Sequence, residues 1–442
     1  MTDIAERHAA ITTTAPNARW HGAAFEARLR RRYAAERRFR LAGLAAVALA
    51  ALVLVLLLGS IAGKGWTAFQ QTQILLEIDF DAAEIDPQGT RDPAVLAKAN
   101  TMKLIRDTLA AQFPEATTRA ERRQLSDLLS SGAPFELNRM LVADPSLVGS
   151  KQAVWLTASA NVDQFIKGHI PRDVPAAERK VNDLQIRAID ALTAKGALTK
   201  AFNTTLFTAG DSRYPEQAGI GGAIVGSLLT LVVCLGLSVP IGVAAAVYLE
   251  EFAPKNRWTD VIEVNINNLA AVPSIIFGLL GLAVFLNVFG MPRSAPLVGG
   301  FVLALMTLPV IIIASRVAMK AVPPSIREAA LGIGASRLQV VLHHVLPLAM
   351  PGILTGIIIG TARALGETAP LLMIGMIAFI VDIPQGFTDS ATVLPVQIFM
   401  WADSPERAFV ERTSAAILVL LGFLILMNGL AVFLRKKFER RW

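Results

Sequence analysis

The sequence predicts an all-α polytopic membrane protein with six transmembrane helices and an α+β domain inserted between the first and the second. Three observations indicate this class. Of the 442 residues, 53% are hydrophobic and 17% are charged, whereas soluble globular proteins average about 25% charged residues. The apolar residues gather in runs long enough to cross a bilayer. The charges concentrate at the two ends and in one long polar segment.

The chain begins with a basic segment that is followed by an apolar run. Residues 1–40 contain nine arginines and four acidic residues, and we expect a cytoplasmic, partly disordered tail that also suits acidic lipid headgroups. Residues 41–63 have no charged side chain, and a helix of this length extends roughly 34 Å, enough for a bilayer. A cleaved signal peptide is the alternative, but its apolar core is usually about 7–15 residues long. We therefore expect a retained first transmembrane helix.

Residues 64–216 differ in composition from the rest of the chain. They contain 18 basic and 19 acidic residues and no run long enough to cross a membrane. Hydrophobic periodicity predicts strands at residues 72–80, 153–159 and 202–210, and helices at residues 95–113, 120–131 and 176–196. This mixture predicts a soluble α+β domain outside the membrane.

Five further apolar runs follow, and residues 217–434 therefore form the main transmembrane domain. The runs are residues 219–249, 264–292, 294–315, about 351–380 and 413–434, and Pro240 and Pro273 predict kinks in the first two. Six spans place both termini on one side of the membrane. The tail at 435–442 has five basic residues and one acidic residue, and positive flanks stay cytoplasmic. We therefore expect two cytoplasmic tails, an outward domain at 64–216 and an inward loop at about 320–347.

The fifth apolar run contains two charged residues. Gly352, Gly356, Gly360, Arg363 and Glu367 fall within about an 80° arc of a helix. Glycines on one face allow a partner helix to come close, and each charge at that depth costs about 2.5–3.5 kcal/mol. Arginine offers a fork of donors that suits an oxyanion. Two interpretations stay open from the residues alone: Arg363 lies on an anion pathway, or it pairs structurally with Glu367.

The loop before this run has its own pattern. The sequence Glu328-Ala329-Ala330, followed by Gly334, predicts a short helix and a turn. A second helix is expected at residues 336–344, with Ser336 as its N-cap and Pro347 as its stop. Two small residues after a carboxylate make a face that another protein approaches closely, and an ordinary amphipathic connector is the alternative.

The segment EAALGIGASRLQVVLHHVLP (residues 328–347) resembles the EAA loop of ABC importer permeases. In that family the loop is a cytoplasmic helix pair that docks in a groove of the ATPase subunit. The resemblance implies an ATPase-coupling role for Arg327, Glu328, Ala329, Ala330 and Gly334. His344 stands where the family usually has an apolar residue, which affects the seating of the second helix.

Three further segments are similar to the phosphate importer permeases PstA and PstC. They are ARALGETAPLL (residues 362–372), NLAAVPSIIFGL (268–279) and GDSRYPEQAGIGGAIVGSLLTL (210–231), and the similarity covers roughly residues 203–434. It implies the type I ABC importer permease fold, with Arg363, Glu367 and Thr368 on the phosphate path. The implied partners are a PstC-like sister permease, a PstB-like ATPase dimer and a PstS-like periplasmic phosphate-binding protein. The implied location is the bacterial inner membrane, and the outward domain is similar to that of longer bacterial variants.

Several other functions are disfavoured by the sequence. It has no phosphate-binding loop of the GxxxxGK[ST] type, so ATP is expected to bind and react on a partner subunit, and no catalytic triad or cofactor is indicated. The acidic group at residues 79–86 lacks the glycine and closing glutamate of a calcium loop, and His343 and His344 point about 100° apart on a helix. Cys234 is expected to be a core residue, and no metal or nucleic acid is expected. The alternatives that remain are a permease for sulfate, molybdate or phosphonate and, less favoured, a membrane sensor.

Overall fold

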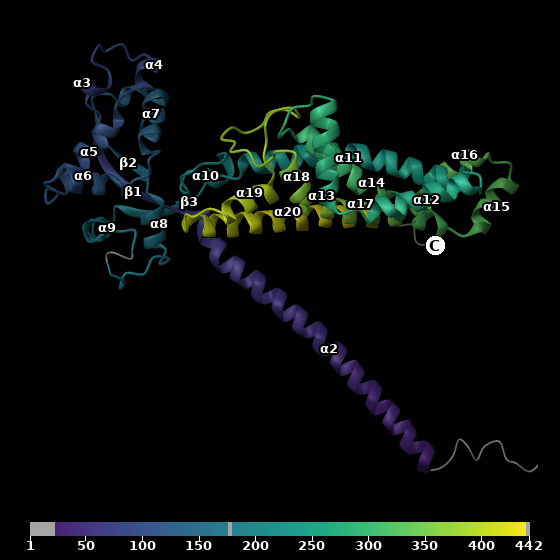
Figure 1. Ribbon diagram of the computed structural model, residues 1–442. Helices are drawn as coiled ribbons and strands as arrows, with labels where there is room; N and C mark the ends of the chain where they lie inside the picture. The colour runs from purple at the N-terminus through teal and green to yellow at the C-terminus, as the bar shows by residue number, and fades with distance from the viewer. Residues whose placement is uncertain (1–22, 176–178, 439–442) are drawn as a thin grey trace, which may run out of the picture. The chain divides into compact units, whose positions relative to one another are not determined.

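The chain is described here from a computed structural model that covers residues 23–175 and 179–438 (Figure 1). It divides into two units, residues 1–61 and residues 62–442, which we describe separately. The described part of the first unit is helical and belongs to α2 (Ala23–Gly65), a single helix of 43 residues. Residues 23–40 are therefore helical, where the sequence analysis expected a partly disordered tail. Alanine and arginine dominate this segment, and both favour helix.

The second unit begins with the insert domain, residues 66–216. Its three-stranded antiparallel sheet has the order β2-β1-β3, formed by β1 (Gln70–Asp79), β2 (Lys151–Thr157) and β3 (Leu198–Phe202). The predicted strands at 72–80 and 153–159 correspond to β1 and β2. In β1, alternate residues Ile74, Leu76 and Ile78 are buried in the domain core, because neighbouring side chains of a strand point to opposite faces.

Short helices surround this sheet. They are α3 (Ala82–Ile85), α4 (Pro93–Leu96), α5 (Thr101–Gln112), α6 (Arg119–Ser126), α7 (Ala133–Ala143), α8 (Ala160–Ile166), α9 (Asp183–Ala194) and α10 (Thr205–Thr208), with single 3₁₀ turns at Trp66–Phe69 and Pro145–Leu147. The helix expected at 95–113 is interrupted between α4 and α5, where the Asn138 amide donates to the carbonyls of Ala97 and Ala99. Of the helix expected at 176–196, residues 176–178 lie outside the described residues, residues 179–182 are not helical, and α9 begins at Asp183, where the Asn182 side chain caps it.

The strand predicted at residues 202–210 is wrong. β3 ends at Phe202, and Thr205–Thr208 is a helical turn. The cause is Asn203, whose side-chain oxygen accepts from the Leu206 backbone N–H at 3.1 Å while its amide donates to the Ala68 carbonyl at 2.9 Å. An asparagine bound to its own chain three residues on starts a turn instead of extending a strand.

The membrane part of the second unit follows the insert domain. Its helices are α11 (Gly221–Val247), α12 (Arg257–Ala270), α13 (Ser274–Leu280), α14 (Pro296–Lys320), α15 (Pro324–Gly332), α16 (Arg337–Val340), α17 (Leu346–Gly366), α18 (Ala369–Met373), α19 (Leu394–Ala402) and α20 (Ala408–Phe438), with π-helical turns at Tyr248–Phe252, Gly281–Val288 and Val341–Val345. By length and composition, five continuous helices of the described chain are able to cross a membrane, or six spans if one bent pair is counted.

The bent pair is the third predicted span. The helices Arg257–Ala270 and Ser274–Val288 meet at an angle of 102°. Pro273 lies at the break, where its ring and its missing N–H prevent the helix from continuing. The kink expected there is thus a full break between two helices.

Candidate functional site

The glycines of the predicted face lie on α17, where it packs against α14. A Cβ atom placed on Gly352 would lie 2.5 Å from the Cβ of Ala318, and one on Gly356 would lie 2.3 Å from the Cβ of Ala314. A Cβ on Gly360 would lie 2.7 Å from Cγ2 of Thr307. Real Cβ atoms do not approach so closely, so the backbone of α17 lies directly against small side chains of α14. The glycine stripe fixes the position of α17 on α14.

This contact gives a test of the packing. Replacement of Gly356 by valine is expected to destabilise the membrane part by about 1–3 kcal/mol, because α17 and α14 must separate to admit the side chain. The same substitution at Gly236 on α11, where a Cβ meets nothing within 4 Å, is the matched control. Thermal unfolding of the purified protein measures both, and equal effects would contradict the close packing.

Arg363 lies in the last turn of α17, and Glu367 directly follows that helix. Arg363 Nε and Glu367 Oε1 are 3.4 Å apart, and the two side chains are 37% and 21% exposed. Among residues 23–175 and 179–438 this is the one hydrogen bond that the guanidinium forms, so its Nη groups have donors to offer. The site is a partly open arginine with a weakly held carboxylate beside it.

The helix does not continue to Ile380 as the sequence analysis expected. α17 ends at Gly366, Glu367 has extended backbone (φ −79°, ψ 119°), and the short helix α18 begins at Ala369. Pro370 explains this, since a proline in a continuing helix would clash with the carbonyl of Gly366 four residues earlier. The carbonyl of Thr368 accepts from the N–H groups of Leu371 and Leu372. Glu367 therefore reaches Arg363 from beyond the helix end and not from the same helical face.

The loop that precedes α17 has the predicted helix–turn–helix form. α15 ends at Gly332, and Gly334 has φ +90°, a conformation that glycine adopts without strain. Ser336 caps α16: its hydroxyl accepts from the Gln339 N–H, and the Gln339 side chain accepts from the Ser336 N–H. The N-cap prediction is confirmed.

Pro347 does not stop the second helix. The chain continues from Arg337 to Gly366 as one apolar helical span. Pro347 is in the first turn of α17, directly after the π-helical turn Val341–Val345. A π-turn is already wider than an α-turn, so a proline directly after it is accommodated without ending the helix.

Arg327 connects this loop to the membrane helices. Its Nη2 donates to Glu251 Oε1 at 2.7 Å and to the Met319 carbonyl at 2.9 Å, and its Nη1 donates to the Val322 carbonyl at 2.7 Å. Met319 lies in the last turn of α14, and Glu251 follows α11. The side chain of Arg327 is thus engaged within the chain and ties α15 to both helices.

The exposed face of the loop contains both charge and apolar surface. Glu328 and Ala329 are exposed, whereas Ala330 is 5% exposed and belongs to a buried cluster with Met319 and Val322. Four large apolar side chains beside them are open to solvent, Ile333 most of all at 83%: Leu331, Ile333, Leu338 and Leu342. Sequence reasoning missed these four residues, although their apolar character at a loop expected to be solvent-exposed was visible. Exposed apolar side chains that gather on one surface are typical of a contact with another protein or with lipid.

The residues discounted as metal ligands have ordinary structural roles. Asp81 accepts from the Ala83 N–H at the start of α3, Asp86 accepts from the Arg91 N–H, and Glu84 pairs with Lys103. Backbone N–H groups around Asp86 hold the pKa of that carboxyl below its ordinary value. Cys234 is buried beside Thr307. No group of three metal-binding side chains occurs among the described residues.

Comparison with known proteins connects these features to a family. Residues 238–442 match the family described as binding-protein-dependent transport system inner membrane component. Residues 26–176 match a domain of unknown function, DUF3333. The phosphate transport system permease protein PstA 1 of Mycobacterium tuberculosis (strain CDC 1551) is 33% identical over 229 residues, which are 51% of this chain and 74% of that protein.

Two further relatives have the same description. PstA of Yersinia pestis is 32% identical over 223 residues, which are 50% of this chain and 74% of that protein. PstA of Haemophilus influenzae is 29% identical over 241 residues, which are 54% of this chain and 83% of that protein. In all three the similarity covers about half of this chain.

Proposed function

The chain belongs to the PstA family of ABC importer permeases, and from this membership we propose that it is the transmembrane permease subunit of an ATP-driven inorganic phosphate importer. Members of this family are permease subunits and not enzymes, so ATP is bound and hydrolysed by a separate subunit. The observation that supports phosphate as the cargo is the family relationship together with Arg363, a partly open arginine at the end of a membrane helix. The Nη groups of such an arginine suit a tetrahedral oxyanion.

The chain is a multi-pass membrane protein. From the family we place it in the bacterial inner membrane. We place both termini in the cytoplasm, because both ends of the sequence are basic. The insert domain then faces the periplasm, and the loop from α15 to α16 faces the cytoplasm.

The mechanism that we propose is alternating access. The exposed face of the loop, with Glu328 and Ala329, docks on the ATPase. Arg327 transmits the motion, because it bonds α15 to the end of α14 and to Glu251 after α11. A push on α15 is thereby delivered to the cytoplasmic ends of two membrane helices. The two states differ in their contacts with the ATPase, which is the condition for coupling.

The partners follow from the same proposal. An ABC importer permease works with an ATPase and a substrate-binding protein, and we propose PstB-like and PstS-like proteins for these roles. A PstC-like sister permease completes the pathway. Arg363, Glu367 and Thr368 line the phosphate path, while Ala330 and the glycines of α17 have packing roles.

Uptake measurements test the cargo. Phosphate-starved cells that lack this chain are expected to recover uptake of labelled phosphate when the wild-type protein is restored, with uptake of labelled sulfate unchanged. The protein level in the membrane fraction is the control. If the wild-type protein restores sulfate uptake and not phosphate uptake, the assignment of phosphate is wrong. The chain would then be a permease for another oxyanion.

A further inference from the structure

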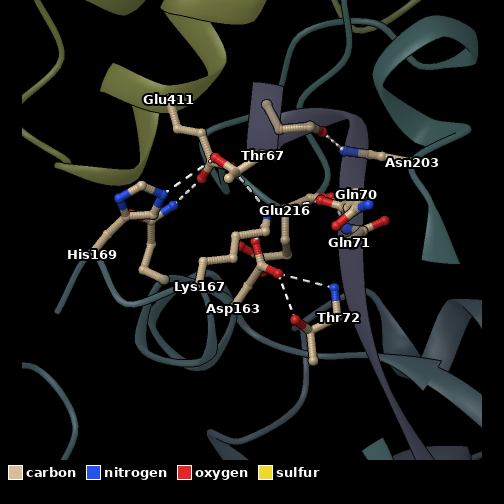
Figure 2. A network of polar contacts seen from close by, with 12 residues as sticks. Thr67, Gln70, Gln71, Thr72, Asp163, Lys167, His169, Asn203, Glu216 and Glu411 are labelled. Atoms are coloured by element: carbon tan, nitrogen blue, oxygen red, sulfur yellow. Dashed lines mark hydrogen bonds and ion pairs between the residues drawn. The ribbon is translucent and has the colours of Figure 1, made fainter. Parts of the chain in front are cut away.

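The insert domain meets the first turns of α20 through a cluster of buried charges. Lys167, which directly follows α8, has a side chain only 3% exposed. Its Nζ lies 2.6 Å from Asp163 Oδ2 and 3.0 Å from Glu411 Oε1 and donates to the Gln70 carbonyl at 2.7 Å (Figure 2). An ammonium group has three donors, so each has an acceptor here. One acceptor, Glu411, belongs to α20, and the other two belong to the insert domain.

The acceptors of Lys167 are themselves fixed. Asp163 Oδ1 accepts from the backbone N–H of Thr72 at 2.9 Å and from its hydroxyl at 2.7 Å, which ties α8 to β1. The second oxygen of Glu411 accepts from the Gln164 amide. Both carboxylates are therefore held by neutral donors as well as by Lys167; Figure 2 shows the two bonds from Thr72 to Asp163. Buried ion pairs are favourable only when the remaining polar atoms are satisfied in this way.

Arg412, the next residue of α20, adds a second cation. It is 5% exposed, and it interacts electrostatically with Asp163, Glu411 and Glu216. Its Nη1 has no hydrogen-bond acceptor among the described residues. Arg412 is thus a second buried cation, next to Glu411 in α20.

Glu216 adds a buried carboxyl at the end of the insert domain. Burial raises the pKa of this carboxyl above the ordinary value, while the Ser130 hydroxyl, which donates to Oε1 at 3.0 Å, and the charge of Arg412 oppose the shift. The other four groups of the cluster are two carboxylates, Asp163 and Glu411, and two cations, Lys167 and Arg412. The charges of these four groups balance, and removal of any one of them leaves another buried and unbalanced.

A second contact supports the same connection. A Cβ atom on Gly65 would lie 2.7 Å from the backbone carbon of Ser414, so the chain that enters the insert domain touches the backbone of α20 one turn after Glu411. A nearby ion pair between Lys180 and Glu406 also joins the two parts, but both side chains are about half exposed, at 48% and 49%. Exposed pairs are screened and contribute little, which makes Lys180 a matched control.

We infer that the insert domain and the first turns of α20 form one rigid body, joined by the buried charges of Asp163, Lys167, Glu411 and Arg412. We call these four residues the ionic joint. The insert domain then moves with the last membrane helix when the permease changes state. A partner that contacts the outer surface of the domain would sense the position of α20. This inference gives the insert domain a mechanical role and is independent of the transported anion.

Hydrogen exchange of the full-length protein in lipid nanodiscs tests the joint. In Lys167→Met, the carboxylates of Asp163 and Glu411 lose the cation between them. We expect the amides of α8 and of residues 408–415 to exchange together, at least about 30-fold faster than in the wild type. In Lys180→Met the same amides should stay within about 5-fold of the wild type. The amides of α5, in the core of the insert domain, serve as the internal reference and should not change in either variant.

The double variant Lys167→Met with Glu411→Gln separates a joint from a simple loss of stability. It removes one cation and one carboxylate, so Asp163 and Arg412 remain as a balanced pair. We expect its exchange to be no faster than that of Lys167→Met alone, which is the non-additivity of a shared network. If the effects of the two substitutions on exchange add, the insert domain and the first turns of α20 are not one body. The same holds if exchange becomes faster in α8 while it stays unchanged in residues 408–415.

A distance measurement covers the case in which Lys167→Met fails to fold. Spin labels on Glu115→Cys in the insert domain and Val410→Cys on α20, both exposed positions, report on the otherwise wild-type protein. The joint predicts one narrow distance distribution that stays the same with and without the ATPase and nucleotide. A broad distribution, or one that shifts between these conditions, would overturn the inference.

Discussion

Replacement of Arg363 by glutamine is expected to lower phosphate uptake by about 10- to 100-fold while the protein still inserts at wild-type levels. The magnitude follows from the loss of a hydrogen bond to a charged group, which contributes about 1.5–3 kcal/mol. The protein is expected to fold because Arg363 is 37% exposed and has, among the residues that the structure describes, one partner at 3.4 Å. Initial uptake rates of labelled phosphate in cells that lack the native chain measure the effect. Arg293→Gln, at an exposed arginine before α14, is the matched control and should transport normally.

Glu367 distinguishes the two roles that the sequence left open for Arg363. If the arginine binds phosphate, Glu367→Gln removes a competing carboxylate and should leave uptake intact or improve it at low phosphate. If the pair is only structural, Glu367→Gln should lose as much uptake as Arg363→Gln, and the double variant should lose no more than either. Wild-type uptake in Arg363→Gln would remove the residue from the pathway and leave the family assignment standing.

Much of the fold was predictable because its signals are local. Apolar runs located the spans, and the strands β1 and β2 were visible from their alternation. Ser336, as an N-cap residue, indicated the start of α16. These features depend on residues a few positions apart, which is the range over which propensity and periodicity act.

The errors came from residues whose effect depends on their surroundings. Pro347 was expected to stop a helix, but a π-turn before it allows the chain to continue. Pro370 had the opposite effect and ended α17 at Gly366, which moved Glu367 off the helix. The ionic joint could not be predicted in the same way: Asp163 and Lys167 are four residues apart, but Lys167 and Glu411 are 244 positions apart. Only the folded chain brings such charges together.

Reversal of charge at Glu328 is expected to abolish assembly with the ATPase. In Glu328→Lys, an exposed carboxylate at the centre of the loop's outer face becomes an ammonium, next to the exposed side chains of Ala329 and Leu331. Truncation of a central interface residue typically costs at least about 2 kcal/mol, and a like-charge contact costs more. We therefore expect the affinity for the ATPase to fall at least about 30-fold. Co-purification of the tagged permease with its ATPase, followed by titration in nanodiscs, measures this.

The control must change the same charge without touching the loop. Glu115→Lys makes the same substitution at an exposed position of the insert domain and should co-purify normally, so a general effect of net charge is excluded.

Arg327→Met provides the complementary case, because Arg327 bonds inward to Glu251 and Met319. That variant should still bind the ATPase but lose ATP-driven uptake, since α15 is no longer tied to α11 and α14. If Arg327→Met instead loses the ATPase and Glu328→Lys retains it, the outward and inward roles given to these two neighbouring residues are reversed. Transmission of the push would then need another connection to the membrane helices.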